Sequence, residues 1–258
     1  MSLESHENLW GAVTGGKPVQ KDAIYADPKD VRPFEFNREV VKVFPDMIGR
    51  SVPGYYLATE LLGNLVGRFA QPGTRIYDLG CSLGAVSWTI QHHMGANTPE
   101  IVAVDNSPAM VEKFRENLSK SSASLDIDVR CEDVRETELS NASVVVLNYT
   151  LQFLEPVERF RLLQRIQEAL VVGGVLLLSE KSKFDSKAQQ ARLVDWHHDF
   201  KRANGYSDME ISQKRKALEN VMILDTVDTH HDRLRQAGFS QSTVWFQCYN
   251  FVSFVAEK

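Results

Sequence analysis

Five short apolar runs, separated by segments with a helical pattern, constrain the fold of this chain more than any other feature. They read RIYDLG (75–80), EIVAVD (100–105), LDIDVRCED (125–133), SVVVLN (143–148) and GVLLLSE (174–180). Strands that alternate with helices form βαβ units. Their helices cover both faces of a parallel sheet, so the strands are buried and are apolar along their whole length. The pattern therefore predicts an α/β fold.

The C-terminal end of the chain holds two further β-rich runs, STVWFQCYN (242–250) and FVSFVAEK (251–258), with no room for a helix between them. They should pair as an antiparallel hairpin. A mostly parallel sheet that ends in this way is the seven-stranded, Rossmann-like methyltransferase fold. With 258 residues and 43% hydrophobic content, the chain is expected to form one domain over residues 31–258.

Two segments lie outside the repeating pattern. Residues 1–30 mix Gly, Pro, Lys and Asp without any period, and we expect them to be an N-terminal extension outside the core. Residues 181–238 are far longer than a one-helix crossover requires, which predicts a helical insertion between strands 5 and 6 that covers the site or joins subunits. Elsewhere, Ser107 before Pro108 should cap a helix, and Gly173-Gly174 should end the helix over 156–170.

Composition and charge exclude several classes of protein. A net charge of −5 disfavours direct binding of nucleic acid. Three scattered cysteines, Cys81, Cys131 and Cys248, predict neither disulfides nor a thiolate zinc site and favour a reducing cytoplasm. The sequence shows neither a signal peptide, which would indicate secretion, nor an apolar stretch of about 18 residues, which would indicate a membrane span. The pairs His92-His93 and His197-His198 should not bind a metal, because adjacent helical residues point about 100° apart.

The turn after the first strand carries the strongest cofactor signal. Residues 76–84 read IYDLGCSLG, so an acid and a small-residue turn precede a helix. A dinucleotide fingerprint would read GxGxxG, whereas here Ser82 occupies the middle position between Gly80 and Gly84. The spacing is typical of the first motif of S-adenosylmethionine-dependent methyltransferases, with both glycines close to the ligand.

Polar residues end the next three strands. Asp105 stands where an acid commonly accepts hydrogen bonds from both ribose hydroxyls; helix capping is the competing interpretation, but Ser107 is better placed for it. Asp133 should lie near the adenine amino group and Asn148 beside the sulfonium. For these two, a turn acid and a strand-end cap remain competing interpretations, since Asp and Asn are common in loops.

An arginine interrupts an apolar stripe in the insertion. Ser207-Asp-Met-Glu210 is a capping box that opens a helix to about Val221, in which Ile211, Arg215, Leu218 and Met222 share one face. We expect Arg215 to be buried, with Lys214 and Lys216 pointing away. A buried guanidinium needs an anion, which is either a ligand carboxylate or, in the competing structural interpretation, a core carboxylate.

Several longer segments resemble one family. They are VFPDMIGRSVPGYY, YDLGCSLGA, VDNSPAM, LNYTLQFLEP, LSEKSKF, HHDFKRANGYSDMEISQKR and WFQCYNF, and together they resemble the bacterial carboxy-S-adenosyl-L-methionine synthases of the tRNA wobble-uridine pathway over residues 37–258. The resemblance implies conversion of S-adenosylmethionine and prephenate into carboxy-S-adenosylmethionine and phenylpyruvate. It also implies a homodimer whose product serves a separate tRNA carboxymethyltransferase acting on uridine 34, without a metal.

The resemblance assigns roles to individual residues. It implies that Arg215 binds the carboxylate, and it assigns no general base. The cofactor contacts that it implies, besides Arg215, fall on Tyr55, Gly80, Cys81, Ser82, Asp105, Asn106, Asp133, Val134 and Asn148. Two other functions stay open at this point: an S-adenosylmethionine-dependent small-molecule methyltransferase, and an inactive S-adenosylmethionine-binding partner of an RNA-modification enzyme.

Overall fold

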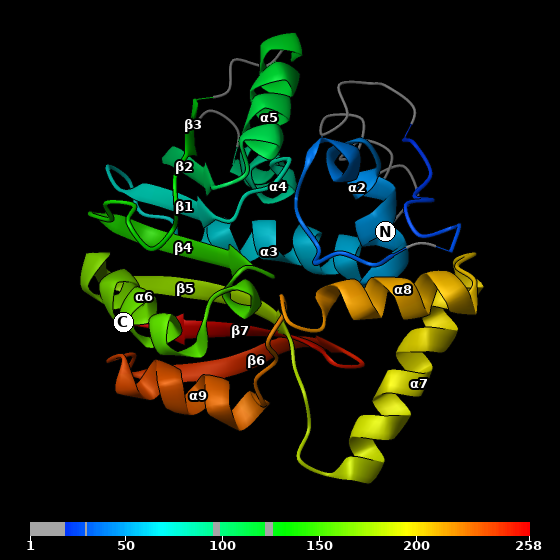
Figure 1. Ribbon diagram of the computed structural model, residues 1–258. Helices are drawn as coiled ribbons and strands as arrows, with labels where there is room; N and C mark the ends of the chain where they lie inside the picture. Colours follow the sequence, from blue (N-terminus) through cyan, green and yellow to red (C-terminus); the bar gives the residue numbers. More distant parts are fainter. Residues whose placement is uncertain (1–18, 29, 95–98, 122–125) are drawn as a thin grey trace.

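The fold is a seven-stranded mixed sheet with helices on both faces (Figure 1), as seen in a computed structural model that describes residues 19–28, 30–94, 99–121 and 126–258. The strand order is β3-β2-β1-β4-β5-β7-β6. Strands β1 to β5 are parallel, β7 runs antiparallel to β5, and β6 runs antiparallel to β7. The predicted mostly parallel, seven-stranded sheet and its C-terminal hairpin are confirmed. The strands are β1 (Arg75–Leu79), β2 (Glu100–Asp105), β3 (Ile127–Cys131), β4 (Ala142–Asn148), β5 (Leu170–Lys181), β6 (Gln241–Cys248) and β7 (Phe251–Glu257).

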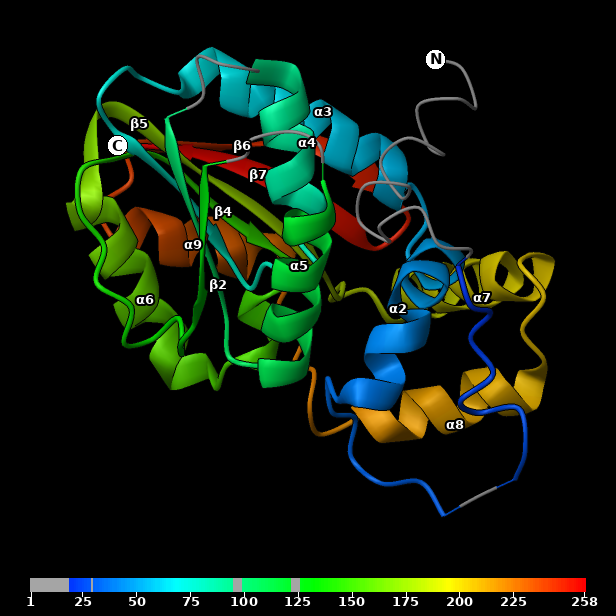
Figure 2. The same cartoon turned by 90° about the horizontal axis from the view of Figure 1, so that it is seen from above.

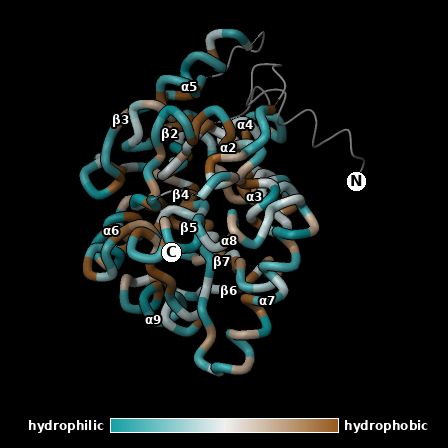
Figure 3. Tube along the Cα trace, turned by 45° about the vertical axis from the view of Figure 1, so that its right-hand side comes forward, coloured by the Kyte–Doolittle hydropathy of each residue, from teal (hydrophilic) through white to brown (hydrophobic). Residues whose placement is uncertain are grey.

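The two faces of the sheet carry different helices. On one face pack α3 (Tyr55–Phe69), α4 (Ala85–Met94) and α5 (Pro108–Lys120); on the other pack α6 (Pro156–Ala169) and α9 (Val227–Gln236). Helices α3, α5, α6 and α9 each bury one side, whereas residues 85–90 of α4 are all buried. Along α6 and α9, hydrophilic and hydrophobic segments alternate (Figure 3). None of the helices within the described residues is long and apolar enough to cross a membrane.

Helix boundaries follow the sequence signals at one place and depart from them at another. Ser107 caps α5 by accepting a hydrogen bond from the Met110 amide, with Pro108 in the first turn, as predicted. The helix predicted over 156–170 spans Pro156–Ala169, but Gly173-Gly174 do not end it, because both glycines lie inside β5. The reason is a register shift in the β4–β5 pairing, where Gly173 takes a φ of 74° that a glycine adopts without strain.

A third layer of helices stands beyond the carboxyl ends of the parallel strands. It consists of α2 (Arg38–Ser51) and two helices of the insertion, α7 (Lys187–Ala203) and α8 (Asp208–Leu218). Figure 2 shows these three helices grouped to one side of the sheet and its covering helices. The predicted insertion between β5 and β6 is therefore helical, and α9 is the part of it that returns to cover the sheet.

The N-terminal segment corrects one expectation. Residues 1–18 lie outside the described residues, but Asp22 is 1% exposed and Tyr25 is 8% exposed. The Tyr25 carbonyl accepts a hydrogen bond from Gln213 on α8, and the Asp22 carboxylate accepts one from Tyr206. This part of the predicted extension belongs to the core of the helical layer, because a short polar segment can be buried when its hydrogen bonds are satisfied.

Candidate active site

A cavity opens between the carboxyl edge of the sheet and the helical layer. Nine of the ten residues assigned to the site from the sequence line it: Tyr55, Gly80, Cys81, Ser82, Asp105, Asn106, Asp133, Val134 and Asn148. They come from the start of α3 and from the ends of four neighbouring strands. The carboxyl ends of parallel strands are where ligands bind in open α/β sheets.

The loop after β1 places bare backbone against this cavity. Gly80 has a φ of 85° and Gly84 one of 83°. A Cβ atom added to Gly80 would lie 2.2 Å from Thr150 Oγ1, and one added to Gly84 would lie 2.1 Å from the Phe114 ring. The amides of Gly80 and Cys81 both donate to the Val104 carbonyl, which fixes the loop to β2. Only glycine fits both positions, and this geometry suits close approach of a nucleoside-containing ligand.

The carboxylate of Asp105 closes β2 beside this loop. Oδ2 accepts a hydrogen bond from the Ser82 amide and Oδ1 one from the Ser107 amide, each 2.9 Å long. Burial raises the pKa of Asp105 above its usual range, and the two amides oppose that shift. Each oxygen keeps a free lone pair, so the group can still accept two ligand hydroxyls. The helix cap is Ser107, and Asp105 is therefore not needed in that role.

Asp133 and Val134 border the cavity at the end of β3. Arg135 donates to both carboxylate oxygens of Asp133, through Nε at 2.9 Å and Nη2 at 2.6 Å, and this pairing is the main cause of a lowered pKa. The Arg135 amide also donates to Oδ1. Asp133 is thus a turn acid that faces the cavity, and the two interpretations given for it are compatible.

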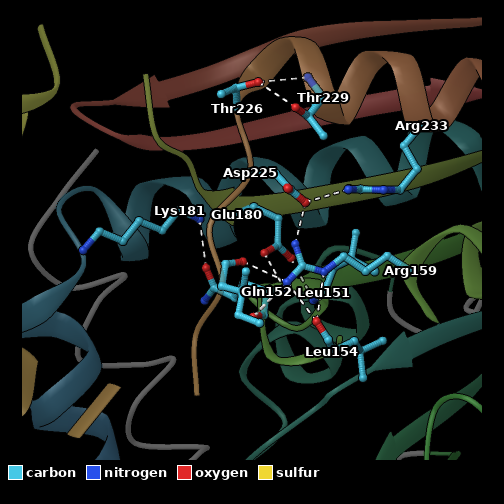
Figure 4. Close-up of polar contacts among 11 residues, drawn as sticks. Leu151, Gln152, Leu154, Arg159, Glu180, Lys181, Asp225, Thr226, Thr229 and Arg233 are labelled. Carbon is cyan, nitrogen blue, oxygen red and sulfur yellow. Dashed lines mark hydrogen bonds and ion pairs between the residues drawn. The ribbon is translucent and has the colours of Figure 1, made fainter. Parts of the chain in front are cut away.

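The turn after β4 is held from β5. Asn148 lines the cavity, and the next residue, Tyr149, has a φ of 63°. The fully buried Glu180 accepts hydrogen bonds from the amides of Leu151 and Gln152, each 2.9 Å long (Figure 4). Burial raises the pKa of Glu180 to about 8. This carboxylate therefore fixes the turn that carries Asn148.

The structure corrects the prediction for α8. Ile211, Lys214 and Ala217 form its buried stripe, whereas Arg215 is exposed and does not line the cavity. Lys214 and Arg215 stand at i+3 and i+4 from Ile211, on either side of it and about 100° apart, so the rotation of the helix about its axis decides which of the two is buried. The capping box at Ser207 and Glu210 is confirmed, but the helix ends at Leu218.

Sequence reasoning missed four basic residues that line the cavity. They are Lys181, His197, Lys201 and Lys214. A signal for two of them exists, because His197 and Lys201 lie at i+4 and i+8 from the buried Leu193 on α7. Asp78, an acid in the β1 motif, also lines the cavity; Ser87 Oγ donates to it at 2.7 Å, and burial raises its pKa to about 6.

Burial changes the protonation of these missed groups. It lowers the pKa of Lys201 to about 8 and, with the charges of Lys201 and Arg215 as further causes, that of Lys181 to about 7. It also lowers the pKa of His197, whose Nε2 lies 2.8 Å from the Ser51 carbonyl oxygen and donates to it. His197 is thus a neutral hydrogen-bond donor to α2. Among the described residues, no three His, Cys, Asp or Glu side chains are grouped to hold a metal.

Comparison with known proteins places this geometry in context. Residues 76–174 match a family model described as a methyltransferase domain. A carboxy-S-adenosyl-L-methionine synthase of Trichlorobacter lovleyi is 54% identical over 92% of this chain and 98% of its own length. A protein of that name from Yersinia enterocolitica is 50% identical over 95% of this chain and 92% of its own length. The human N-acetylserotonin methyltransferase structure superposes with a TM-score of 0.60 at 18% identity, covering 98% of this chain and 66% of its own, which shows a shared fold.

Proposed function

The chain belongs to the family of carboxy-S-adenosyl-L-methionine synthases, and from this premise we propose that it converts S-adenosylmethionine and prephenate into carboxy-S-adenosylmethionine and phenylpyruvate. The observation that supports the proposal is a single cavity whose two ends differ in the residues that line them. Its sheet end gathers the nine residues assigned to S-adenosylmethionine, and its helical end presents three lysines suited to an anionic second substrate.

The chemistry needs little from the protein besides position. The sulfonium acidifies the attached methyl group, and loss of a proton leaves an ylide carbon that attacks carbon dioxide to form the new C–C bond. Prephenate aromatises by losing its ring carboxylate as carbon dioxide and its hydroxyl as hydroxide, which takes the methyl proton and becomes water. One S-adenosylmethionine and one prephenate thus yield one carboxy-S-adenosylmethionine, one phenylpyruvate and one water. The residues position both substrates and exclude solvent.

Arg215 keeps a proposed role as the partner of the transferred carboxylate. Its exposed position removes the argument from a buried stripe, but its charge lies close enough to lower the pKa values of Lys181 and His198. A long arginine side chain so near Lys181 can extend toward the cavity, and its planar guanidinium can bind a carboxylate through two hydrogen bonds. The proposal for Arg215 thus rests on the resemblance and on this electrostatic proximity.

We further propose that the protein is a cytoplasmic homodimer whose product passes to a separate tRNA-modifying enzyme. The insertion supports an interface, because Trp196 on α7 is 47% exposed and Met209 on α8 is 37% exposed. Three free cysteines fit a reducing compartment. The net charge of −5 argues against direct tRNA binding by this chain.

The test of the proposed function is a product analysis by mass spectrometry. We expect the purified protein, given S-adenosylmethionine and prephenate, to form a species heavier than S-adenosylmethionine by the mass of carbon dioxide, with an equal amount of phenylpyruvate. Omitting prephenate should abolish both products. Accumulation of S-adenosylhomocysteine would instead indicate a methyltransferase, and no turnover with any acceptor would indicate an inactive binding partner.

A further inference from the structure

Three lysines from three separate elements meet at the helical end of the cavity. Lys181 ends β5, Lys201 lies in the last turn of α7, and Lys214 lies on the buried stripe of α8. Lys201 is 8% exposed and Lys214 is 7% exposed. Lysine usually keeps its ammonium in water while only its stem is covered. Here the two helical lysines are almost entirely buried as residues, and both line the cavity.

The charges of these lysines are poorly compensated. Lys214 Nζ donates to Ser51 Oγ at 3.0 Å and lies 3.8 Å from the Asp22 carboxylate. No carboxylate in the described ranges lies within ion-pair distance of Lys181 or Lys201. The Lys181 ammonium instead lies 5.7 Å from the centre of the Phe251 ring, and its side chain points away from the carboxylate of the adjacent Glu180 (Figure 4).

Buried cations without partners are unfavourable, and like charges close together are more so. The pKa values respond as expected: burial lowers that of Lys214 to about 7, and the charge of Lys201 contributes to the depressions at both Lys181 and Lys214. S-adenosylmethionine cannot be the reason for such a cluster, because its sulfonium and ammonium outweigh its single carboxylate. A ligand with more than one negative charge would balance it.

We propose that Lys181, Lys201 and Lys214 form the binding site for the two carboxylates of the carboxyl donor. The proposal rests on the proposed function, which requires a dicarboxylate beside S-adenosylmethionine. It also explains release, because the donor enters as a dianion and leaves, after losing one carboxylate as carbon dioxide, as a monoanion that the same lysines bind less strongly. Charge-assisted hydrogen bonds of this kind are among the stronger polar contacts in proteins.

The experiment compares Lys201→Met with Lys187→Met, an exposed lysine at the start of the same helix. Calorimetry would titrate prephenate into protein saturated with S-adenosylhomocysteine, and separate titrations would give the affinity for S-adenosylhomocysteine. We expect Lys201→Met to weaken prephenate binding about 10- to 100-fold, the scale of one charge-assisted bond. Lys201→Arg should restore part of the loss, and Lys187→Met should leave it unchanged. S-adenosylhomocysteine should bind all four proteins alike, which also verifies folding.

The outcomes separate this proposal from the proposed function. Turnover of prephenate with an unchanged KM in both Lys201→Met and Lys181→Met would overturn the lysine site and leave the function standing. Lysine-dependent prephenate binding without any carboxy product would support the site and overturn the function. Equal weakening of prephenate and S-adenosylhomocysteine would assign the lysines to the amino-acid carboxylate of the cofactor and overturn the proposal. Absence of prephenate binding to the unaltered protein would overturn it as well.

Discussion

Two buried charge clusters begin at adjacent residues of β5 and differ in their compensation. In the first cluster, Glu180 lies near Arg159 and Asp225 (Figure 4). Arg159 forms an ion pair with Asp225 at 2.5 Å, and Arg233 forms a second one with the same carboxylate at 2.8 Å. We call this set the compensated cluster. Lys181 faces the cavity with Lys201 and Lys214, a set that we call the cationic cluster. Because successive side chains of a strand point to opposite faces, one element supplies both.

The difference between the clusters indicates what each is for. In the compensated cluster, Arg159 is 1% exposed and donates to the carbonyls of Gln152, Leu154 and Ile223 as well as to Asp225. The Arg159 guanidinium is thus paired through all three of its nitrogens, so it fixes the turn after β4 and the segment before α9. The cationic cluster is left with excess charge, which is useful only when a ligand supplies the balance.

Breaking the compensated cluster should have the largest effect. Arg159→Met would remove one donor from each of three carbonyls, of which that of Gln152 keeps the Ile223 amide, and would leave Asp225 with one partner fewer. We expect the free energy of unfolding to fall by about 3–5 kcal/mol, the usual result of removing one partner of a buried ion pair. Urea denaturation would measure it, with Arg235→Met as control, because Arg235 pairs with Asp232 on the exposed side of α9. A loss no larger than that of the control would mean that the cluster is not structural.

Arg215 sharpens the comparison, because it is a cation near the cavity that belongs to neither cluster. We expect Arg215→Ala to weaken carboxy-S-adenosylmethionine about 10- to 150-fold more than S-adenosylmethionine, since only the former carries the extra carboxylate. Arg215→Lys should recover part of this difference. Calorimetry with both ligands measures it, and Lys216→Ala is the control on the exposed side of the same helix. Equal weakening of both ligands with a lowered melting temperature would assign Arg215 a structural role.

The pH dependence of donor binding probes the cationic cluster directly. With pKa values of about 7 for Lys181 and Lys214 and about 8 for Lys201, the free protein loses these charges as the pH rises. A bound dianion raises the pKa values, so binding takes up protons, and affinity should fall about tenfold per pH unit for each proton taken up. The other charged or titratable groups that face these lysines are Asp22, Asp46, Arg50, His197, His198, Tyr206 and Arg215.

Calorimetry with prephenate between pH 6.5 and 9.5 would measure this dependence. Affinity should be level at the acid end and fall above about pH 7 to 8, because the charged form of the lysines is the binding form. The histidines do not contribute over this range, since the pKa values of His197 and His198 are both lowered. An affinity that stays constant up to pH 9 would contradict the assignment of the lysines.

The smallest expected effect is on the stability of the ligand-free protein. Lys201→Met removes a buried charge that lacks a partner within the described residues, so the free energy of unfolding should stay the same or rise by about 1 kcal/mol. Lys187→Met should change it by no more than about 0.5 kcal/mol. Urea denaturation of both variants tests this expectation. A clear loss of stability in Lys201→Met would mean that the ammonium has a structural partner, and the contrast with Arg159 would disappear.

The sequence alone determined the fold and the sheet end of the site. The strands, their succession along the chain and the C-terminal hairpin follow from local patterns of apolar residues and turns. Gly80, Asp105 and Asn148 could be placed because they sit at strand ends, and the ends of parallel strands share one edge of the sheet. The N-terminal segment, the Gly173-Gly174 pair and the buried face of α8 could not be placed, because each depends on what packs against it.

Tertiary structure alone decided the helical end of the site. Lys181, Lys201 and Lys214 are far apart in sequence and carry no motif, so only the packing of α7 and α8 against α2 brings them together. The same packing selected Lys214 over Arg215 for burial. Lys214 and Arg215 are adjacent and point about 100° apart on the helix. Lys214 is the one that meets partners from distant segments, Ser51 and Asp22. Local sequence sets which residues compete for a face, and long-range contacts choose between them.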